Sequence, residues 1–206
     1  MSVLATTSVR SARKAKGDGH LRRGEILEAA ERIFIADGYE GATIRKIADA
    51  VGVSSTALYM HFPDKSRILQ EICERTLRVL LARNSEIAAK PLDPVVRVRM
   101  MLEAYMLWGL EHPNTYQLVY TTPRPSVPET ADLSSQCYDV FSGAVREIAA
   151  AGRLRTGSAD SAAQSLWMAG HGVVALLIAR PDFSWSPQND LIAVTLDGLL
   201  HGLVVD

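Results

Sequence analysis

Apolar residues recur three or four positions apart along almost the whole chain, which is the period of an amphipathic α-helix. The first such segment, residues 21–37 (LRRGEILEAAERIFIAD), predicts a helix that Gly38 closes. No stretch alternates apolar and polar residues between hairpin turns, so β-strands are not expected. The pattern therefore predicts an all-α fold.

The stretch TIRKIADAVGVSSTALYMHF holds two short apolar patterns on either side of a glycine. Thr43 can cap a helix that Gly52 ends, because glycine adopts the left-handed backbone of a tight turn without steric cost. Ser54 or Ser55 can cap a third helix that runs to about Phe62. A glycine-hinged pair of short helices is the geometry of the helix-turn-helix motif.

The helical patterns that follow are longer, and prolines, glycines and one loop separate them. Their predicted ranges are 64–89, 93–111, 114–121, 129–151, 158–180 and 187–204. The order of three small helices and a larger bundle predicts three parts of the chain. These parts are a disordered basic tail over residues 1–20, a helix-turn-helix domain over 21–68 and a helical bundle over 69–206. The long fourth helix joins the helix-turn-helix domain to the bundle.

Composition narrows the class of protein. The chain has 206 residues, 48% of them hydrophobic, so it can bury a core. Its two cysteines, Cys73 and Cys137, lack metal-ligand spacing and are interpreted as buried thiols of a reducing compartment. The N-terminal segment has no apolar signal core, and the most apolar run, 166–179, contains His171 and is shorter than a membrane span. We therefore expect a soluble, cytoplasmic protein with no membrane partner.

Charge is divided unevenly along the chain, although the formal net charge is only -1. Residues 1–67 carry 11 Lys and Arg against 8 Asp and Glu, and the remainder carries 11 against 15. A basic head on an acidic body suggests a polyanionic partner for the head. The alternative, in which the basic charge only keeps a tail solvated, stays open.

Polar residues of the helix-turn-helix segment stand where base edges and phosphates would lie. Ser55 and Thr56 begin the third helix, Tyr59 and His61 lie further along it, and Lys65 begins the fourth. The predicted DNA-binding residues are Thr43, Arg45, Ser54, Ser55, Thr56, Tyr59, His61 and Lys65. Each also has a structural interpretation, such as a helix cap, half-buried packing or an ordinary exposed histidine.

The segment from Arg23 to Leu69 resembles the N-terminal DNA-binding domain of TetR-family transcriptional regulators. The shared motifs are Phe-x-x-x-Gly-Tyr, Thr-x-x-x-Ile-Ala, Gly-Val-Ser and Leu-Tyr-x-His-Phe-x-x-Lys. Further on, SLWMAGHGVVALLIAR contains Trp-x-x-x-His-Gly, which resembles the pattern of one C-terminal domain subclass. The resemblance implies a homodimer that contacts operator DNA, and the family positions matching Thr43, Arg45, Ser55, Tyr59, His61 and Lys65 commonly touch DNA. It also implies a repressor, which we expect a small, largely apolar effector to release. We expect no enzymatic activity, no cofactor and no metal.

The family varies in its C-terminal domain, which usually binds a small molecule and carries the dimer interface, so candidate ligand residues come from the side chains themselves. A stripe of Met and aromatic residues at spacings of four and three forms either core or one wall of an adaptable apolar pocket. A tyrosine and a histidine could add polar handles, although a lone histidine on an apolar helix also reads as a hydrogen-bonded core residue. The candidates are Met101, Tyr105, Trp108, Tyr116, Trp167 and His171.

The last two predicted helices, 158–180 and 187–204, carry more apolar residues than one inward stripe needs. With their symmetry mates they would form a four-helix dimer interface, and burial within one protomer is the alternative.

A second interpretation of the function competes with that of a transcription regulator. In it, the chain is a helical ligand-binding protein or an enzyme that uses the helix-turn-helix only as a scaffold. The sequence holds no His-Glu-x-x-His, phosphate-binding glycine loop or nucleophile elbow to favour an enzyme. A DNA-bound structural protein without an effector is a third possibility.

Overall fold

The computed structural model describes residues 19–121, 128–155 and 157–205 of the chain. Most of the predicted tail and of the loop after the sixth helix lie outside these ranges. Within them no β-strand occurs, only an isolated bridge between Leu154 and Val204, and the predicted all-α fold is confirmed. The helices are α1 (Gly19–Gly41), α2 (Ile44–Ala50), α3 (Ser55–Tyr59), α4 (Lys65–Ala88), α5 (Pro94–Glu111), α6 (Pro113–Tyr120), α7 (Pro128–Ala150), α8 (Ala159–Ala179) and α9 (Gln188–Leu203).

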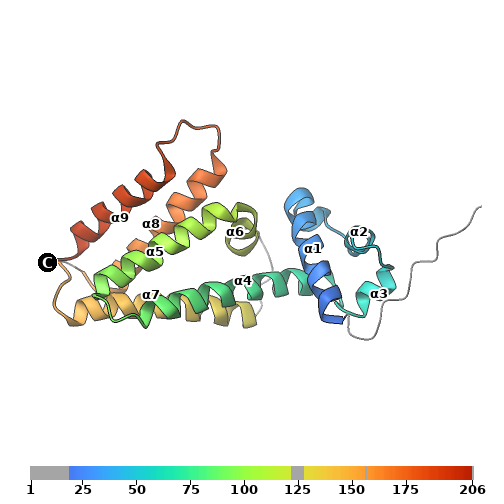
Figure 1. Ribbon diagram of the computed structural model, residues 1–206, viewed down its shortest axis with the longest axis horizontal. Helices are drawn as coiled ribbons and strands as arrows, with labels where there is room; N and C mark the ends of the chain where they lie inside the picture. The colour runs from blue at the N-terminus through green and yellow to red at the C-terminus, as the bar shows by residue number, and fades with distance from the viewer. Residues whose placement is uncertain (1–18, 122–127, 156, 206) are drawn as a thin grey trace, which may run out of the picture.

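The helices form a small head and a larger body, and α4 runs from one into the other (Figure 1). The head consists of α1, α2, α3 and the start of α4. In the body, α4 packs along α7, α5 packs against both α7 and α8, and α9 packs against α5 and α8. This arrangement leaves α8 and α9 on one edge of the body, joined by a connection that extends away from it (Figure 1).

The helix-turn-helix pair forms for the local reasons that its sequence indicates. The Thr43 hydroxyl accepts a hydrogen bond from the Lys46 amide at 3.2 Å, and so caps α2. Gly52 has a φ of 68°, which a side chain would strain. Ser54, not Ser55, caps α3 by accepting from the Ala57 amide at 3.1 Å.

Two boundaries in the head differ from the prediction. The third helix ends at Tyr59 instead of Phe62, and the chain continues as a turn in which the amides of His61 and Phe62 both donate to the Leu58 carbonyl, at 2.9 and 3.0 Å. The first helix gains a further turn to Gly41 beyond the predicted stop. Gly38 still breaks the helical backbone, with a φ of 70° and a ψ of 170°.

Each part has its own apolar core. In the head the fully buried side chains include Ile47 and Leu58 from the helix pair and Phe62 just after it. Each such side chain contributes roughly 1.5–3 kcal/mol when removed from water. In the body, α5 and α8 approach so closely that a Cβ on Gly109 would lie 2.7 Å from Cγ1 of Val174. The head core therefore fixes the angle between α2 and α3, and glycine at 109 permits the contact between α5 and α8.

Candidate DNA-binding surface and ligand cavity

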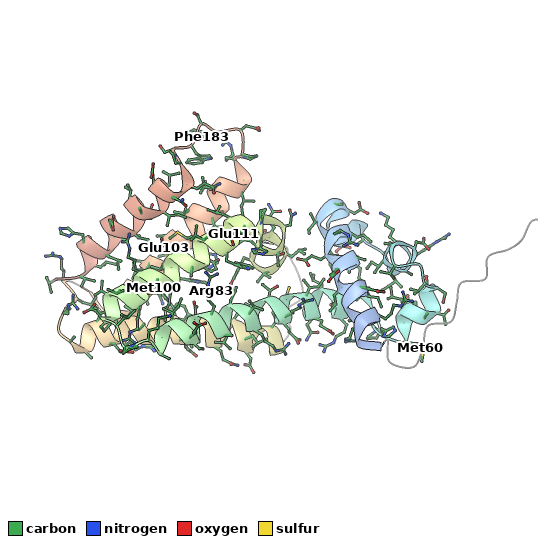
Figure 2. All side chains as sticks on the ribbon, viewed as in Figure 1. Met60, Arg83, Met100, Glu103, Glu111 and Phe183 are labelled. Carbon is green, nitrogen blue, oxygen red and sulfur yellow. The ribbon has the colours of Figure 1, made fainter. Side chains whose placement is uncertain are left out.

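The side chains of α3 that the sequence assigns to DNA point away from the head core. Thr56 and Ala57 are exposed, and Tyr59 exposes 54% of its surface. Ser55 is half-buried. Met60, which follows the helix, is 84% exposed and lies at the outer end of the head (Figure 2). This short helix therefore presents a mixed polar and apolar surface to solvent.

The candidates at the starts of α2 and α3 are exposed, and two of them also cap these helices. Thr43 and Ser54 are both caps and both exposed, so the structural interpretation and a surface position hold together. Arg45 is 87% exposed in its side chain and has only a loose ion pair with Asp49, at 3.9 Å. Such an exposed pair contributes little to stability. The Arg45 guanidinium is thus available to an anionic partner.

Lys65 is turned inward. Its Nζ donates to the Tyr39 carbonyl at 2.7 Å and lies 4.3 Å from the Tyr39 ring centre. It also lies 3.4 Å from the Ala42 carbonyl oxygen and 3.6 Å from a carboxylate oxygen of Glu40. Lys65 therefore fastens the start of α4 to the end of α1. Its contact with a phosphate stays a prediction.

Arg23 holds three elements of the head together, a role that the sequence did not reveal. Its guanidinium pairs with Glu71 on α4 and donates from Nη1 to the His61 carbonyl at 2.8 Å. It also lies 4.1 Å from the centre of the Phe62 ring. The side chain of His61 is partly exposed beside this clamp. From sequence, Arg23 could be seen only as one more positive charge.

A cavity of about 240 Å³ lies in the body between α4, α5, α7 and α8. Three of the six predicted ligand residues, Met101, Tyr105 and Trp167, line it. None of the described residues that line it carries a charged side chain. The other lining residues are Leu77, Leu80, Asn84, Leu102, Tyr120, Ser134, Cys137, Tyr138 and Phe141.

His171 and Tyr116, two further candidates, lie behind the cavity wall. The Tyr105 and Tyr116 hydroxyls lie 2.9 and 3.1 Å from Nδ1 of His171. The rings of Tyr120 and Trp167 stand edge-on to the imidazole, with centres 4.7 and 4.8 Å away. His171 is therefore the centre of an aromatic cluster whose members Tyr105, Tyr120 and Trp167 also face the cavity.

Burial sets the charge of this cluster. It lowers the pKa of His171 to about 4, so the imidazole is neutral at pH 7. Burial also raises the pKa of Tyr105 and of Tyr116, which keeps both phenols protonated. The pKa of the Cys137 thiol rises to about 11 for the same reason. The cavity and the cluster behind it are thus uncharged at neutral pH.

Trp108, the sixth candidate, does not line this cavity. It is buried, stacks on His112 with ring centres 5.8 Å apart, and borders a separate groove near Leu27 of α1. Seven residues separate Trp108 from Met101, which moves it about 10 Å along α5 towards the head. The predicted stripe therefore continues beyond the end of the cavity.

The helix α6 contacts both the aromatic cluster and the head. Tyr116 and Tyr120 belong to the cluster, whereas Leu118 and Val119 are buried in the head core. The Thr115 hydroxyl also donates to the Glu31 carboxylate on α1. One eight-residue helix thus joins the cavity wall to the helix-turn-helix domain.

The outward face of α8 and α9 is apolar and exposed. Trp167, Met168, Leu176 and Val194 are 44%, 61%, 55% and 72% exposed. By length and composition α8 could cross a membrane. The sequence pattern predicted no such segment, and the difference arises because the full helix adds residues to the apolar run. Only 28% of its most apolar window is buried in the protomer. A face of this kind marks an interaction surface.

A braced helix-turn-helix head and a helical body with an apolar cavity define a class of protein, the one-component DNA-binding regulators. The family model for "Bacterial regulatory proteins, tetR family" matches residues 26–72, and that for "Tetracyclin repressor-like, C-terminal domain" matches residues 98–199. The chain belongs to the TetR family, which confirms the resemblance seen in its motifs. The Trp-x-x-x-His-Gly subclass stays a prediction.

Two curated relatives are regulators of opposite sign. The transcriptional repressor KstR2 of Mycobacterium tuberculosis is 32% identical over 107 residues, which are 52% of this chain and 53% of KstR2. The transcriptional activator FasR of Mycolicibacterium smegmatis is 30% identical over 141 residues, 64% of each chain. The chain spans about half the length of the first curated relatives it matches.

Solved structures share the fold over most of the chain. A tetR-family regulatory protein from Rhodococcus RHA1 has a TM-score of 0.78 at 23% identity, covering 90% of this chain and 98% of that one. The regulator FadR from Bacillus subtilis, solved with stearoyl-CoA, has a TM-score of 0.75 at 17% identity, covering 87% and 98%. At these identities the likeness extends to the fold only.

Proposed function

We propose that the protein is a dimeric transcription regulator that binds operator DNA and releases it when a small uncharged molecule enters the body cavity. The observation that best supports this proposal is a combination of two features. The helix α3 faces outward from the packed head core, and α6 links the head to the wall of an apolar cavity in the body. Membership of the TetR family supports the same conclusion. Repression is the family default, although both a repressor and an activator occur among the relatives.

Operator binding is assigned to Thr43, Arg45, Ser54, Ser55, Thr56, Tyr59, His61 and Lys65. Tyr59 is the most informative of these, because its exposed ring packs little and its loss should leave the head folded. Selection of genomic fragments by the purified protein, followed by gel shifts, tests the assignment. We expect Tyr59→Ala to weaken binding to a selected fragment by about 1–3 kcal/mol, or roughly 5- to 150-fold. Unchanged affinity for Tyr59→Ala and Arg45→Ala would contradict it.

Size and charge restrict the effector. A 150 Å³ apolar cavity holds benzene, so by proportion a cavity of about 240 Å³ holds roughly ten non-hydrogen atoms. Asn84, Ser134 and the tyrosine hydroxyls provide neutral hydrogen-bonding groups. A carboxylate would lose its hydration with no cation among the lining residues to replace it. The best fit is a neutral molecule of one or two rings with a hydroxyl or carbonyl group.

A matched ligand series tests this chemistry. We expect 1-naphthol to raise the melting temperature, naphthalene to raise it less, and 1-naphthoate to leave it unchanged, because only the first combines apolar rings with a neutral polar group. Trp167→Ala, at the exposed side of the cavity, should reduce the response to 1-naphthol. A response to the carboxylate equal to that of the alcohol would refute the neutral-effector assignment. FadR, with its stearoyl-CoA, shows that the same fold can hold a much larger molecule.

We also propose a homodimer through α8 and α9, with the protein in the cytoplasm, where operator DNA lies. The exposed apolar residues on both helices support the interface. So do Gly172, Gly198 and Gly202, where a Cβ would meet no other part of the protomer within 4 Å beyond its own stretch of helix, so that another helix can approach. An enzymatic function is not favoured, because the family model describes regulatory proteins and the relatives KstR2 and FasR are transcription regulators.

A further inference from the structure

The helix α3 and its flanks lack the side chains that recognise a base through paired hydrogen bonds. Arg or Lys pairs in this way with guanine, and Asn or Gln with adenine. None of residues 54–61 (SSTALYMH), all of which the structure describes, is of these types. Their hydroxyls and the imidazole of His61 offer single hydrogen bonds, and a serine or threonine hydroxyl bonds to either kind of base. Hydrogen bonds from this segment therefore discriminate weakly between bases.

The exposed side of α3 is instead rich in apolar groups. Thr56 and Ala57 are exposed, and Met60 exposes 84% of its surface at the outer end of the head (Figure 2). Met60 still has helical backbone angles, with a φ of -70° and a ψ of -19°. Positions three and four apart on a helix share a face, so Met60 lies beside both Thr56 and Ala57. We call these three residues the α3 patch.

The α3 patch is not part of the protomer's own packing. Among the described residues, the head core includes Leu58, on the inward side of the helix, but neither Ala57 nor Met60. The patch also lies apart from the exposed apolar face of α8 and α9, which belongs to the body (Figure 1). The Met60 side chain is left in water, and its burial against a partner would be favourable. The patch therefore suits a partner that offers apolar groups.

In the major groove of DNA, that apolar group is the C5-methyl of thymine. The groove is about 12 Å wide and admits an α-helix, and alanine and the threonine methyl are typical contacts of the thymine methyl there. The flexible thioether of Met60 adapts to such a surface. The side chains of Ala57 and Met60 carry neither charge nor hydrogen-bond donor, so phosphates are not their partners. The exposed guanidinium of Arg45, on α2, suits a phosphate better.

We propose that the α3 patch binds thymine methyl groups in the major groove, and so selects half-sites with thymine at the positions that face it. This inference rests on the proposed DNA-binding function and names the base that this function recognises. Phosphate contacts position the head on the duplex, and the buried methyl groups supply the specificity.

The test removes the methyl group and leaves the rest of the base unchanged. Deoxyuridine keeps the hydrogen-bonding groups of thymidine and lacks only the C5-methyl. A genomic fragment that the purified protein selects provides the half-sites, and deoxyuridine replaces each of their thymidines in turn. Fluorescence anisotropy measures the affinity of the full-length chain for each duplex at one salt concentration.

Two variants assign the effect to the patch. Met60→Ala removes every side-chain atom beyond Cβ at an exposed position, so the head should stay folded. Leu92→Ala removes the same number of non-hydrogen atoms from a side chain that is 43% exposed just before α5, and is the matched control. Circular dichroism melting verifies that both variants are folded.

We expect deoxyuridine to weaken binding of the unmodified chain about fourfold for each methyl group lost from the contact. Met60→Ala should lose this sensitivity at one position at least, because the side chain and the methyl group act as a pair, whereas Leu92→Ala should keep it at every position. Three results would overturn the inference and leave the proposed function intact: half-sites without thymine, equal affinity for thymidine and deoxyuridine at every position, or unchanged sensitivity in Met60→Ala. An unmodified chain that binds no genomic fragment overturns both.

Discussion

At the scale of the single residue, His171 combines a central position in the aromatic cluster with a lowered pKa. Two tyrosine hydroxyls lie within hydrogen-bond distance of its Nδ1, and burial lowers its pKa to about 4. An unfolded histidine titrates near pH 6.5, so between about pH 6.5 and pH 4 the unfolded chain binds a proton that the folded chain does not. The folded state should therefore lose stability as pH falls through this window.

The substitution His171→Asn removes the titrating group and keeps a polar atom near Nδ1. We expect the melting temperature of the unmodified chain to fall more between about pH 7 and pH 4.5 than that of the variant. His201→Asn, which changes an exposed histidine, is the matched control and should show the unmodified pH dependence. Parallel curves for His171→Asn and the unmodified chain would mean that the imidazole titrates normally in the folded state.

Lys65 gives a second prediction at the residue scale. Its ammonium has two backbone carbonyls and a tyrosine ring as partners, so Lys65→Met should lower the free energy of unfolding by about 1–3 kcal/mol. Lys90→Met should change it by less than about 0.5 kcal/mol, because Lys90 has only a loose surface pair with Glu86. Urea unfolding measures both. Similar losses for the two variants would show that the Lys65 contacts do not stabilise the head.

Individual residues also show which local features of the head could be predicted from the sequence and which could not. Thr43, Gly52 and Ser54 were predictable, because a cap or a left-handed turn depends on neighbours within a few positions. The inward turn of Lys65 was not, because its partners Tyr39 and Ala42 lie more than twenty positions earlier in the chain. A side chain whose partners are distant in the sequence has no local signature.

At the scale of the element, the helices were predicted within a few residues but the cavity only in part. Met101 and Tyr105 stood out as large residues on one helix, and both line it. Tyr120, Tyr138 and Phe141 come from α6 and α7, where apolar periodicity reads as ordinary core. Only the packing of these helices against α5 shows which core residues leave space between them.

The helix α6 is the element that can couple effector to operator, because it contacts the cluster on one side and α1 on the other. Thr115→Val removes its hydrogen bond to Glu31 and keeps the shape of the side chain. We expect the variant to retain its thermal response to 1-naphthol but to lose part of the ligand's effect on operator affinity, about 0.5–2 kcal/mol of coupling. Anisotropy with a genomic fragment that the protein selects, with and without 1-naphthol, measures the coupling.

A threonine at the end of the same helix provides the control. The Thr121 hydroxyl donates to the Gln117 carbonyl at 2.9 Å, within its own helix, so Thr121→Val should leave the coupling unchanged. Coupling that survives in Thr115→Val would show that the signal passes from body to head by another route, such as α4, which runs through both.

At the scale of the whole molecule, the exposed face of α8 and α9 decides how two heads are placed on DNA. One head reads one half-site, and the pairing of two bodies sets the spacing between their recognition helices. A charge placed on this face would have to be desolvated against an apolar partner. We therefore expect Val194→Asp to convert a dimer into a protomer of 22.5 kDa in light scattering, and to weaken operator binding in parallel.

Val79→Asp is the matched control, because Val79 is 59% exposed on α4, away from this face, and should remain dimeric. Since α8 is also long and apolar enough to cross a membrane, both variants and the unmodified chain are mixed with phosphatidylcholine vesicles and sedimented. Dimerisation predicts that the unmodified chain stays in the supernatant. A different result would assign the face to lipid instead of to a second copy. The unmodified chain would then have a monomeric mass in solution and would sediment with the vesicles, and Val194→Asp would abolish this sedimentation.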